Sequence, residues 1–223
     1  MQDKIDIILK NFKFIHERKK IEPKQYDFEL VWNLILQLGQ KLMPVDVEFT
    51  LVDERNEFYR QMIYYFFNDP KFKGDLARGL FIHGRKGTGK SMAVKIFNHF
   101  SFNNMLQITK CFSSYVCDNI VTEFEQTGMK KITEYNTGNK HFDELGDEVR
   151  NAVFFGTTRN IMKYILSVRN NLFVNTGKIT IITSNYAQEH IGKLYDVRIE
   201  DRWNEMFNDI VLDGESLRKK YKK

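Results

Sequence analysis

A short glycine-rich segment constrains the fold of this chain more than any other feature. Residues 84–91 read G-R-K-G-T-G-K-S and fit the pattern G-x-x-x-x-G-K-[ST]. An apolar run, residues 79–83, precedes the segment, and apolar residues recur at helical spacing over residues 91–102. A strand, a tight glycine loop and a helix in this order predict a loop that binds the phosphates of a nucleotide.

The chemistry of phosphate binding explains these residue types. Glycines let the backbone turn tightly, so that successive N–H groups converge on phosphate oxygens, and the following helix start adds partial positive charge. Lys90 is expected to reach the β- and γ-phosphates, and the Ser91 hydroxyl to ligate Mg²⁺. The predicted ligand contacts come from Gly84, Lys86, Gly87, Thr88, Gly89, Lys90 and Ser91.

The size and composition of the chain indicate one globular domain. Its 223 residues are too few for two ordinary domains, and 42% hydrophobic with 28% charged residues exclude a disordered chain. No apolar run approaches the roughly 18 residues of a membrane span. The two cysteines are too few for a disulfide framework. We therefore expect a cytoplasmic protein that does not associate with a membrane.

The positive charge of the chain is concentrated at one place. There are 34 Lys and Arg against 29 Asp and Glu, but five of the basic residues lie within residues 218–223. The remaining chain is balanced in formal charge. A surface that binds nucleic acid must therefore arise from local placement of charge, because the net value does not indicate one.

Patterning along the chain predicts an α/β fold. Residues 1–44 predict two helices, the second capped by Asp27 and ended before Pro44, and residues 56–68 predict a third. From residue 79 onward, strands and helices alternate, which predicts a mainly parallel sheet. Strands are expected at 79–83, 108–112 and 178–183, and helices at 91–102, from Ser113 or Ser114 to 127, and at 153–173, with 132–135 and 139–142 irregular.

A pair of adjacent acids follows the glycine loop by about fifty residues. Asp143 is expected to hold the Mg²⁺ shell, and Glu144 to orient and deprotonate an attacking water. The run before them, residues 138–142, is poor in apolar residues for a buried strand. Two acids that begin a surface helix are the alternative interpretation.

Several motifs in fixed order resemble one family. After the glycine loop come F-D-E-L-G-D-E, I-T-I-I-T-S-N, Y-D-V-R-I-E-D-R-W-N-E-M and G-E-S-L-R. Together they resemble the AAA+ ATPases of the DnaC/IstB type over residues 49–218. The resemblance implies a three-layer P-loop NTPase (AAA+) domain over residues 49–223, a short helical N-terminal extension over residues 1–48, and no C-terminal lid domain, since few residues follow Arg202.

The resemblance also implies roles for individual residues. Asn185 matches sensor I, whose amide polarises the lytic water or the γ-phosphate; an asparagine in a strand-ending turn is the alternative. Arg202 matches the arginine finger that completes the ATP site of a neighbouring subunit, with Arg198 as its competitor. Both could instead be solvated or ion-paired arginines. Arg218 matches the sensor II arginine.

The implied activity is ATP hydrolysis with Mg²⁺, weak in the isolated subunit and completed by self-association at a shared ATP site. The favoured function is loading of a hexameric replicative DNA helicase onto single-stranded DNA. The alternatives are an IstB-like transposition helper that binds DNA and a transposase, and a P-loop small-molecule or nucleotide kinase.

Two sets of side chains are candidates for contacts with partners. An apolar helix face with Phe28, Trp32 and Ile35 could dock on a helicase or simply pack on the core. For DNA, the candidates are the lysines Lys130 and Lys131, with the aromatic residues Tyr115 or Phe112 as stacking groups.

Overall fold

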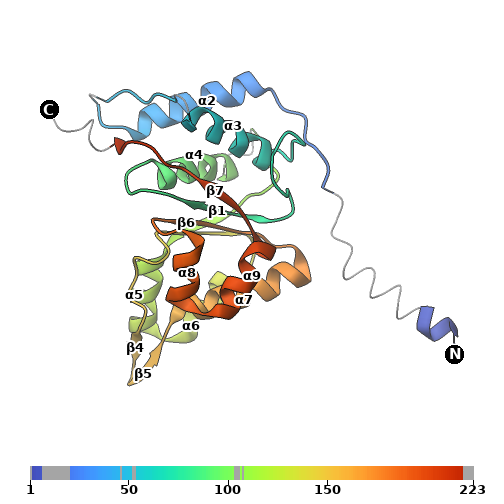
Figure 1. Ribbon diagram of the computed structural model, residues 1–223, viewed down its shortest axis with the longest axis vertical. Coiled ribbons are helices and arrows are strands. Elements are labelled where there is room, and N and C mark those ends of the chain that lie inside the picture. Colours follow the sequence, from blue (N-terminus) through green and yellow to red (C-terminus); the bar gives the residue numbers. More distant parts are fainter. Residues whose placement is uncertain are drawn as a thin grey trace.

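A five-stranded parallel sheet forms the centre of the protein (Figure 1). The computed structural model describes residues 2–6, 21–45, 47–51, 54–102, 106 and 108–217. The strands of the sheet are β1 (Gly79–His83), β2 (Ser113–Val116), β3 (Lys140–Asp143), β6 (Thr180–Ser184) and β7 (Phe207–Val211). They lie in the order β2-β3-β6-β1-β7, and every neighbouring pair is parallel. The predicted α/β fold with a mainly parallel sheet is confirmed.

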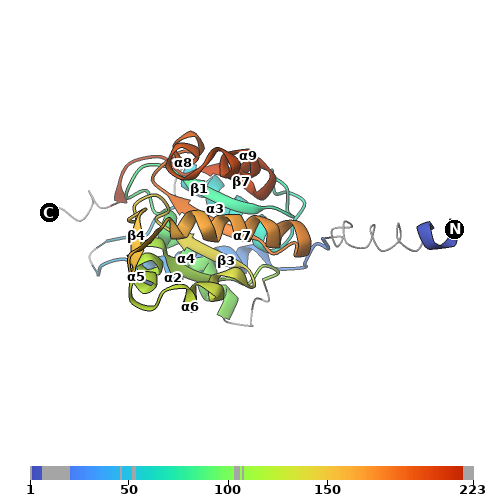
Figure 2. The same cartoon turned by 90° about the horizontal axis from the view of Figure 1, so that it is seen from below.

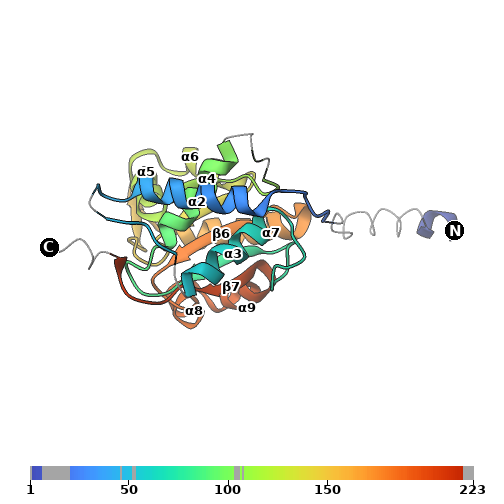
Figure 3. The same cartoon turned by 90° about the horizontal axis from the view of Figure 1, so that it is seen from above.

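Helices cover both faces of the sheet. On one face lie α2 (Phe28–Leu42), α3 (Glu54–Phe66) and α4 (Lys90–Phe102), which face the viewer in Figure 3. On the other lie α5 (Cys117–Thr127), α7 (Ile161–Thr176), α8 (Gln188–Tyr195) and α9 (Val197–Met206), as Figure 2 shows. A short helix α6 (Met129–Ile132) and a 3₁₀ turn (Thr133–Asn136) follow α5. The arrangement is the predicted three-layer fold.

The sequences of the central strands explain why the core has two halves. Side chains alternate between the faces of a strand. In β1, Leu80 and Ile82 pack into the cluster beneath α2, α3 and α4, whereas Phe81 packs into the cluster beneath α5, α7 and α9. Ile181 and Ile182 of β6 divide in the same way. Strands buried on both faces are therefore continuously apolar, as parallel sheets require.

The N-terminal helix α2 is part of this core. Asp27 caps it as predicted, accepting a hydrogen bond from the Leu30 amide at 3.1 Å. Val31 and Ile35 are completely buried against the cluster that also contains α3 and α4. Ile35 is therefore unavailable for docking on a partner. Of the first predicted helix, only residues 2–6 are described, and they are helical; the rest lies outside the described residues.

The aromatic residues of α2 are also partly covered. The Arg60 guanidinium lies over the rings of Phe28 and Trp32, 5.4 and 5.2 Å from their centroids. The two rings stack on each other at 5.9 Å. This face of α2 packs on α3. Of the two predictions for it, docking on a helicase or packing on the core, the structure shows packing on the core.

The prediction of a strand over residues 108–112 is wrong, and so is the prediction of a helix that begins at Ser113 or Ser114. Both serines lie in β2, which pairs in parallel with β3, and α5 begins at Cys117 with no side-chain cap. The end of that helix at Thr127 is confirmed, with Gly128 at a φ of 65°. Ser114 is favourable in this strand because its Oγ contacts His141 Nδ1 at 2.7 Å.

Two further predictions after β2 are wrong. Residues 140–142, expected to be irregular, belong to β3, and the helix expected over residues 153–173 begins only at Ile161. Residues before it form the antiparallel hairpin of β4 (Ala152–Phe154) and β5 (Thr157–Arg159). Asn160 separates the hairpin from α7, because its side chain accepts the Lys163 amide at 2.9 Å and caps the helix. The strand β7 was not predicted.

A buried arginine joins α7 to the sheet. Arg169 is fully buried and donates to Thr180 Oγ1 at 2.8 Å, to the Gly138 carbonyl at 2.7 Å and to the Ile179 carbonyl. Burial lowers the pKa of its guanidinium to about 10. These contacts join α7 to the starts of β3 and β6.

Candidate functional site

The glycine loop lies where β1 ends and α4 begins, at the carboxyl edge of the sheet. Gly84, Gly87 and Gly89 have φ values of 141°, 88° and 103°, which L side chains rarely adopt. A Cβ atom on Gly84 would lie 2.2 Å from the Leu212 carbonyl oxygen, and one on Gly87 would lie 2.2 Å from Ser216 Oγ. Both the backbone conformation and the close approach of residues 212–217 therefore require glycine.

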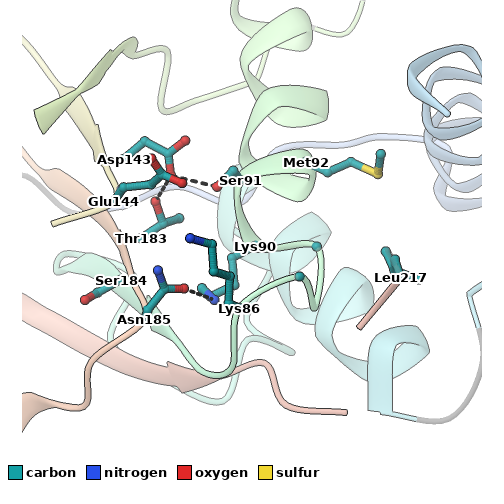
Figure 4. Close-up of a pocket in the computed structure, with 12 residues that line it drawn as sticks. Lys86, Lys90, Ser91, Met92, Asp143, Glu144, Thr183, Ser184, Asn185 and Leu217 are labelled. Atoms are coloured by element: carbon teal, nitrogen blue, oxygen red, sulfur yellow. Dashed lines mark hydrogen bonds between the residues drawn. The ribbon is translucent and has the colours of Figure 1, made fainter. Parts of the chain in front are cut away.

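Lys90, the first residue of α4, points back into the loop (Figure 4). Its side chain donates to the carbonyls of Gly84 at 2.7 Å and Arg85 at 2.8 Å, and to Asn185 Oδ1 at 3.1 Å. Only 6% of the residue is exposed. The ammonium group thus lies within the turn of the loop, where phosphate oxygens would be its alternative partners. The Thr88 hydroxyl closes the turn on the Arg85 carbonyl at 3.0 Å.

Ser91 and Asp143 meet across the gap between α4 and β3. Ser91 Oγ donates to Asp143 Oδ1 at 2.8 Å, and the Thr183 hydroxyl donates to the same carboxylate oxygen. A hydroxyl and a carboxylate at this distance are hard oxygen ligands, which suit Mg²⁺ with water and phosphate in its other positions. The residues present therefore fit the predicted Mg²⁺.

A chain of hydrogen bonds supports Asp143 from behind. His141 is buried between Ser114 Oγ, 2.7 Å from its Nδ1, and Thr183 Oγ1, 3.2 Å from its Nε2. Burial lowers the pKa of its imidazole to about 4, against the opposing effect of the Asp143 carboxylate. A neutral ring fits these two hydroxyl partners. The polar character of β3, which made it a poor strand by sequence, follows from this contact.

Glu144 and Asn185 border the same cavity from neighbouring strands. Glu144 follows β3 with a φ of 60°, and its exposed side chain lies beside Asp143 (Figure 4). Asn185 follows β6, which pairs with β1 as expected for a sensor I position. Its Oδ1 accepts from Lys90 while its Nδ2 donates to Asp147 Oδ2 at 2.7 Å. The amide is thus oriented on both sides.

These side chains surround one cavity of about 190 Å³. The segment after β7 closes one side of it, since the Leu217 amide donates to the Gly87 carbonyl at 2.9 Å. Arg218, predicted as sensor II, lies outside the described residues. The cavity is lined by Lys86, Gly87, Gly89, Lys90, Ser91, Met92, Asp143, Glu144, Thr183, Ser184, Asn185 and Leu217.

The two candidates for an arginine finger lie elsewhere. Arg198 and Arg202 are exposed on α9 and border a second cavity, of about 200 Å³, between α7 and α9. Neither lines the cavity at the glycine loop.

The residues predicted to contact DNA are not equivalent. Phe112 is only 4% exposed and packs in the core, so stacking of a base on it is ruled out. Tyr115 is half-buried, with its ring in an edge contact with Tyr135 and under the Lys140 ammonium. Lys130 and Lys131 are exposed on α6, and Lys131 pairs with Glu123 at 3.1 Å.

Three residues of the site were missed by sequence reasoning. His141 and Thr183 orient Asp143, and Asp147 orients Asn185. The available sequence signal for His141 was a histidine at a position of a buried strand that is usually apolar. The roles of Thr183 and Asp147 follow only from the pairing of β3 with β6, which brings the ends of these strands together.

Fold and site together define a class. A parallel sheet in this order, with a glycine loop after the inner strand β1 and an acid pair at the end of β3, is the P-loop NTPase fold of AAA+ proteins. The described residues contain no helix long and apolar enough to span a membrane.

Solved structures with this fold include proteins of DNA replication. The chain is similar to the crystal structure of DnaI (TM-score 0.53, 20% identity, 82% of this chain and 91% of that chain). It is likewise similar to the DnaC helicase loader (TM-score 0.51, 17% identity, 82% and 99%). A third is the replication initiator DnaA bound to AMPPCP and single-stranded DNA (TM-score 0.50, 16% identity, 78% and 53%).

These similarities confirm the predicted resemblance to DnaC-type AAA+ proteins at the level of the fold. No protein-family model matches the sequence, and no curated protein sequence matches it.

Proposed function

We propose that this protein is an ATP-dependent AAA+ helicase loader, which places a hexameric replicative DNA helicase on single-stranded DNA. The observation that carries the proposal is the convergence of Lys90, Ser91, Asp143 and Asn185 on one cavity at the glycine loop. The similarity to DnaI and DnaC over more than nine tenths of their chains supports the loader role. Residues 49–223 form the ATPase domain in this proposal.

The chemistry follows from the contacts of each side chain. Lys90 and the loop amides bind the phosphates, and Glu144 orients and deprotonates the attacking water. Ser91 and Asp143 hold Mg²⁺, which neutralises charge on the phosphates. Asn185, fixed by Lys90 and Asp147, polarises the water or the γ-phosphate. Since Arg202 lies outside its own cavity, hydrolysis is completed by a second copy of the chain.

ATP hydrolysis by mixed variants tests the shared site. Glu144→Gln and Arg202→Ala are each expected to reduce turnover strongly, and Arg202→Ala by about 10³-fold or more. A mixture of the two should recover part of the activity, because one interface then keeps both residues. Arg198→Ala is the matched control one turn away on α9. Loss of turnover in Arg198→Ala alone, with recovery when it is mixed with Glu144→Gln, would move the finger to Arg198, and no recovery with either arginine variant would exclude a site completed in trans.

Capture of a partner separates the loader from the alternatives. A hexameric replicative helicase should retain the protein in a pull-down with ATP, and a transposase should not. Retention by the transposase alone would favour the IstB-like function, and ATP-dependent phosphorylation of a small acceptor would favour a kinase. Because α2 belongs to the core, a truncation that tests N-terminal docking should remove residues 1–20 and leave α2 in place.

A further inference from the structure

The β4–β5 hairpin ends in an exposed phenylalanine. Phe155 and Gly156 form its two-residue turn, with φ values of 46° and 75°. Such a turn usually begins with Asn, Asp or Gly, because bulky side chains are strained at positive φ. Nevertheless 93% of Phe155 is exposed, and its ring contacts only that of Phe154, at 4.7 Å, among the described residues. The residue thus combines backbone strain with an exposed ring, which is typical of a functional position.

The base of the hairpin packs against α5, which gives the tip a defined place on the surface. Ala152 is completely buried, and the Phe154 ring lies 5.9 Å from that of Phe124. Gly128 lies directly beneath Phe154, since a Cβ there would be 2.5 Å from the ring. Figure 1 shows the hairpin projecting at one end of the molecule, beyond α5. Little conformational entropy would be lost when a ligand binds at such a tip.

Basic residues outnumber acids along residues 149–188, and one acid of α5, Glu125, lies against the hairpin, where it accepts the Val153 amide at 3.4 Å. Residues 149–188 contain five basic residues and no Asp or Glu, although the chain apart from its last six residues is balanced in charge. Arg169 is buried with its own partners, and Lys163 pairs with Asp196 at 2.6 Å. Arg150 and Arg159 are exposed, and neither forms an ion pair with a residue that the structure describes. Two cations are therefore available on the hairpin and its approach.

We infer that the β4–β5 hairpin binds single-stranded nucleic acid, with the Phe155 ring stacked on an unpaired base and Arg150 and Arg159 on phosphates. Stacking on an exposed aromatic ring beside cations is the usual recognition of single strands. Thr157 and Thr158 are exposed beside the ring, as are Val149 and Val153, and the two exposed arginines favour a ligand with phosphates over an apolar protein pocket. The inference rests on the proposed function for its biological setting.

The hairpin also lies close to the nucleotide site along the chain. It follows Glu144 by a short segment in which Asp147 accepts from Asn185. In the same segment, Glu148 accepts from the Gly146 amide at 2.7 Å and from the Tyr195 hydroxyl. A strand held at Phe155 is thus attached to the segment that orients the sensor-like Asn185.

The test measures the binding of a labelled oligo(dT) of about 20 nucleotides by fluorescence anisotropy, in the presence of AMPPCP and Mg²⁺. Phe155→Ala should raise the Kd for oligo(dT) by about 5- to 100-fold. Phe155→Trp should bind with the Kd of the parent chain, and the fluorescence of its indole should be quenched when oligo(dT) binds. Arg159→Gln should reduce the slope of log Kd against log salt by about 0.7. Val174→Ala, an exposed apolar residue on α7, is the matched control.

An unchanged Kd for Phe155→Ala overturns the inference. The inference is also overturned if a duplex binds as tightly as oligo(dT) and its binding likewise depends on Phe155. Unchanged oligo(dT) binding with loss of helicase capture assigns the ring to a protein partner and also overturns it. Circular dichroism and thermal melting of each variant should match those of the parent chain, since the side chain is exposed. AMPPCP binding is measured in the same samples, so failure of the ATP-dependent function is seen separately from failure of the hairpin.

Discussion

At the scale of single residues, polar side chains inside the sheet orient the residues that face the cavity. His141 contacts Ser114 and Thr183, and Thr183 in turn contacts Asp143. Each partner comes from a different strand. The carboxylate that is expected to hold Mg²⁺ is therefore fixed by the register of the sheet. Partners of this kind commonly change metal affinity by one or two orders of magnitude.

Replacing His141 by leucine should weaken the Mg²⁺ site more than the nucleotide site. We expect the Mg²⁺ concentration for half-maximal ATP hydrolysis to rise about 10-fold, because Thr183 loses its partner and Asp143 its fixed orientation. Binding of a fluorescent ATP analogue in EDTA should stay within a factor of two or so of the parent value. The Mg²⁺ requirement of His141→Gln, which keeps one polar contact, should lie between those of the parent chain and of His141→Leu. An unchanged Mg²⁺ requirement in His141→Leu would show that the chain of contacts is only structural.

Lys110 should make stability depend on pH. Its buried ammonium donates to the Tyr65 carbonyl at 2.7 Å and to Asn68, and burial lowers its pKa to about 7. Below pH 7 the cost of the buried charge is fully present. Between pH 7 and about 10.4 the unfolded chain binds more protons, so stability rises with pH.

The comparison is with Lys110→Met, measured by urea unfolding at several pH values. The free energy of unfolding of the parent chain, minus that of the variant, should increase by up to about 3 kcal/mol from pH 6.5 to 9.5. A difference that does not change with pH would mean that Lys110 stays protonated in the folded protein.

At the scale of elements, the sequence predicts some boundaries well and others poorly. The loop before α4 and the cap of α2 are local chemistry, and both predictions are confirmed. The hairpin was missed because residues 153–173 are apolar at spacings that suit a helix, and only the turn at Phe155 and the cap at Asn160 interrupt it. The ends of β2 and β3 depend on partners distant in sequence, which local patterns do not contain.

Arg169→Met should destabilise the protein, because it removes the contacts between α7 and the starts of β3 and β6. We expect a loss of about 2 to 4 kcal/mol, since two buried acceptors, on Thr180 and Ile179, and the Gly138 carbonyl lose their donor. Thermal and urea unfolding measure it, with Arg150→Met, an exposed arginine, as the control at about 0.5 kcal/mol or less. Equal or greater stability of Arg169→Met would mean that desolvation of the guanidinium outweighs its hydrogen bonds.

At the scale of the whole molecule, the order of the strands has a consequence for how the protein is made. The inner strand β1 pairs with β6 and β7, which follow it by about a hundred residues or more. During synthesis β1 therefore leaves the ribosome long before either of its neighbours exists, with both edges open. Contacts so distant in sequence fold slowly and leave apolar strands exposed to aggregation. The glycine loop attached to β1 acquires its final shape only when β7 and residues 212–217 have been added. A growing chain thus gains the capacity to bind a nucleotide only after residues 212–217 have been made, and protection of β1 by a chaperone until then should govern the yield of active protein.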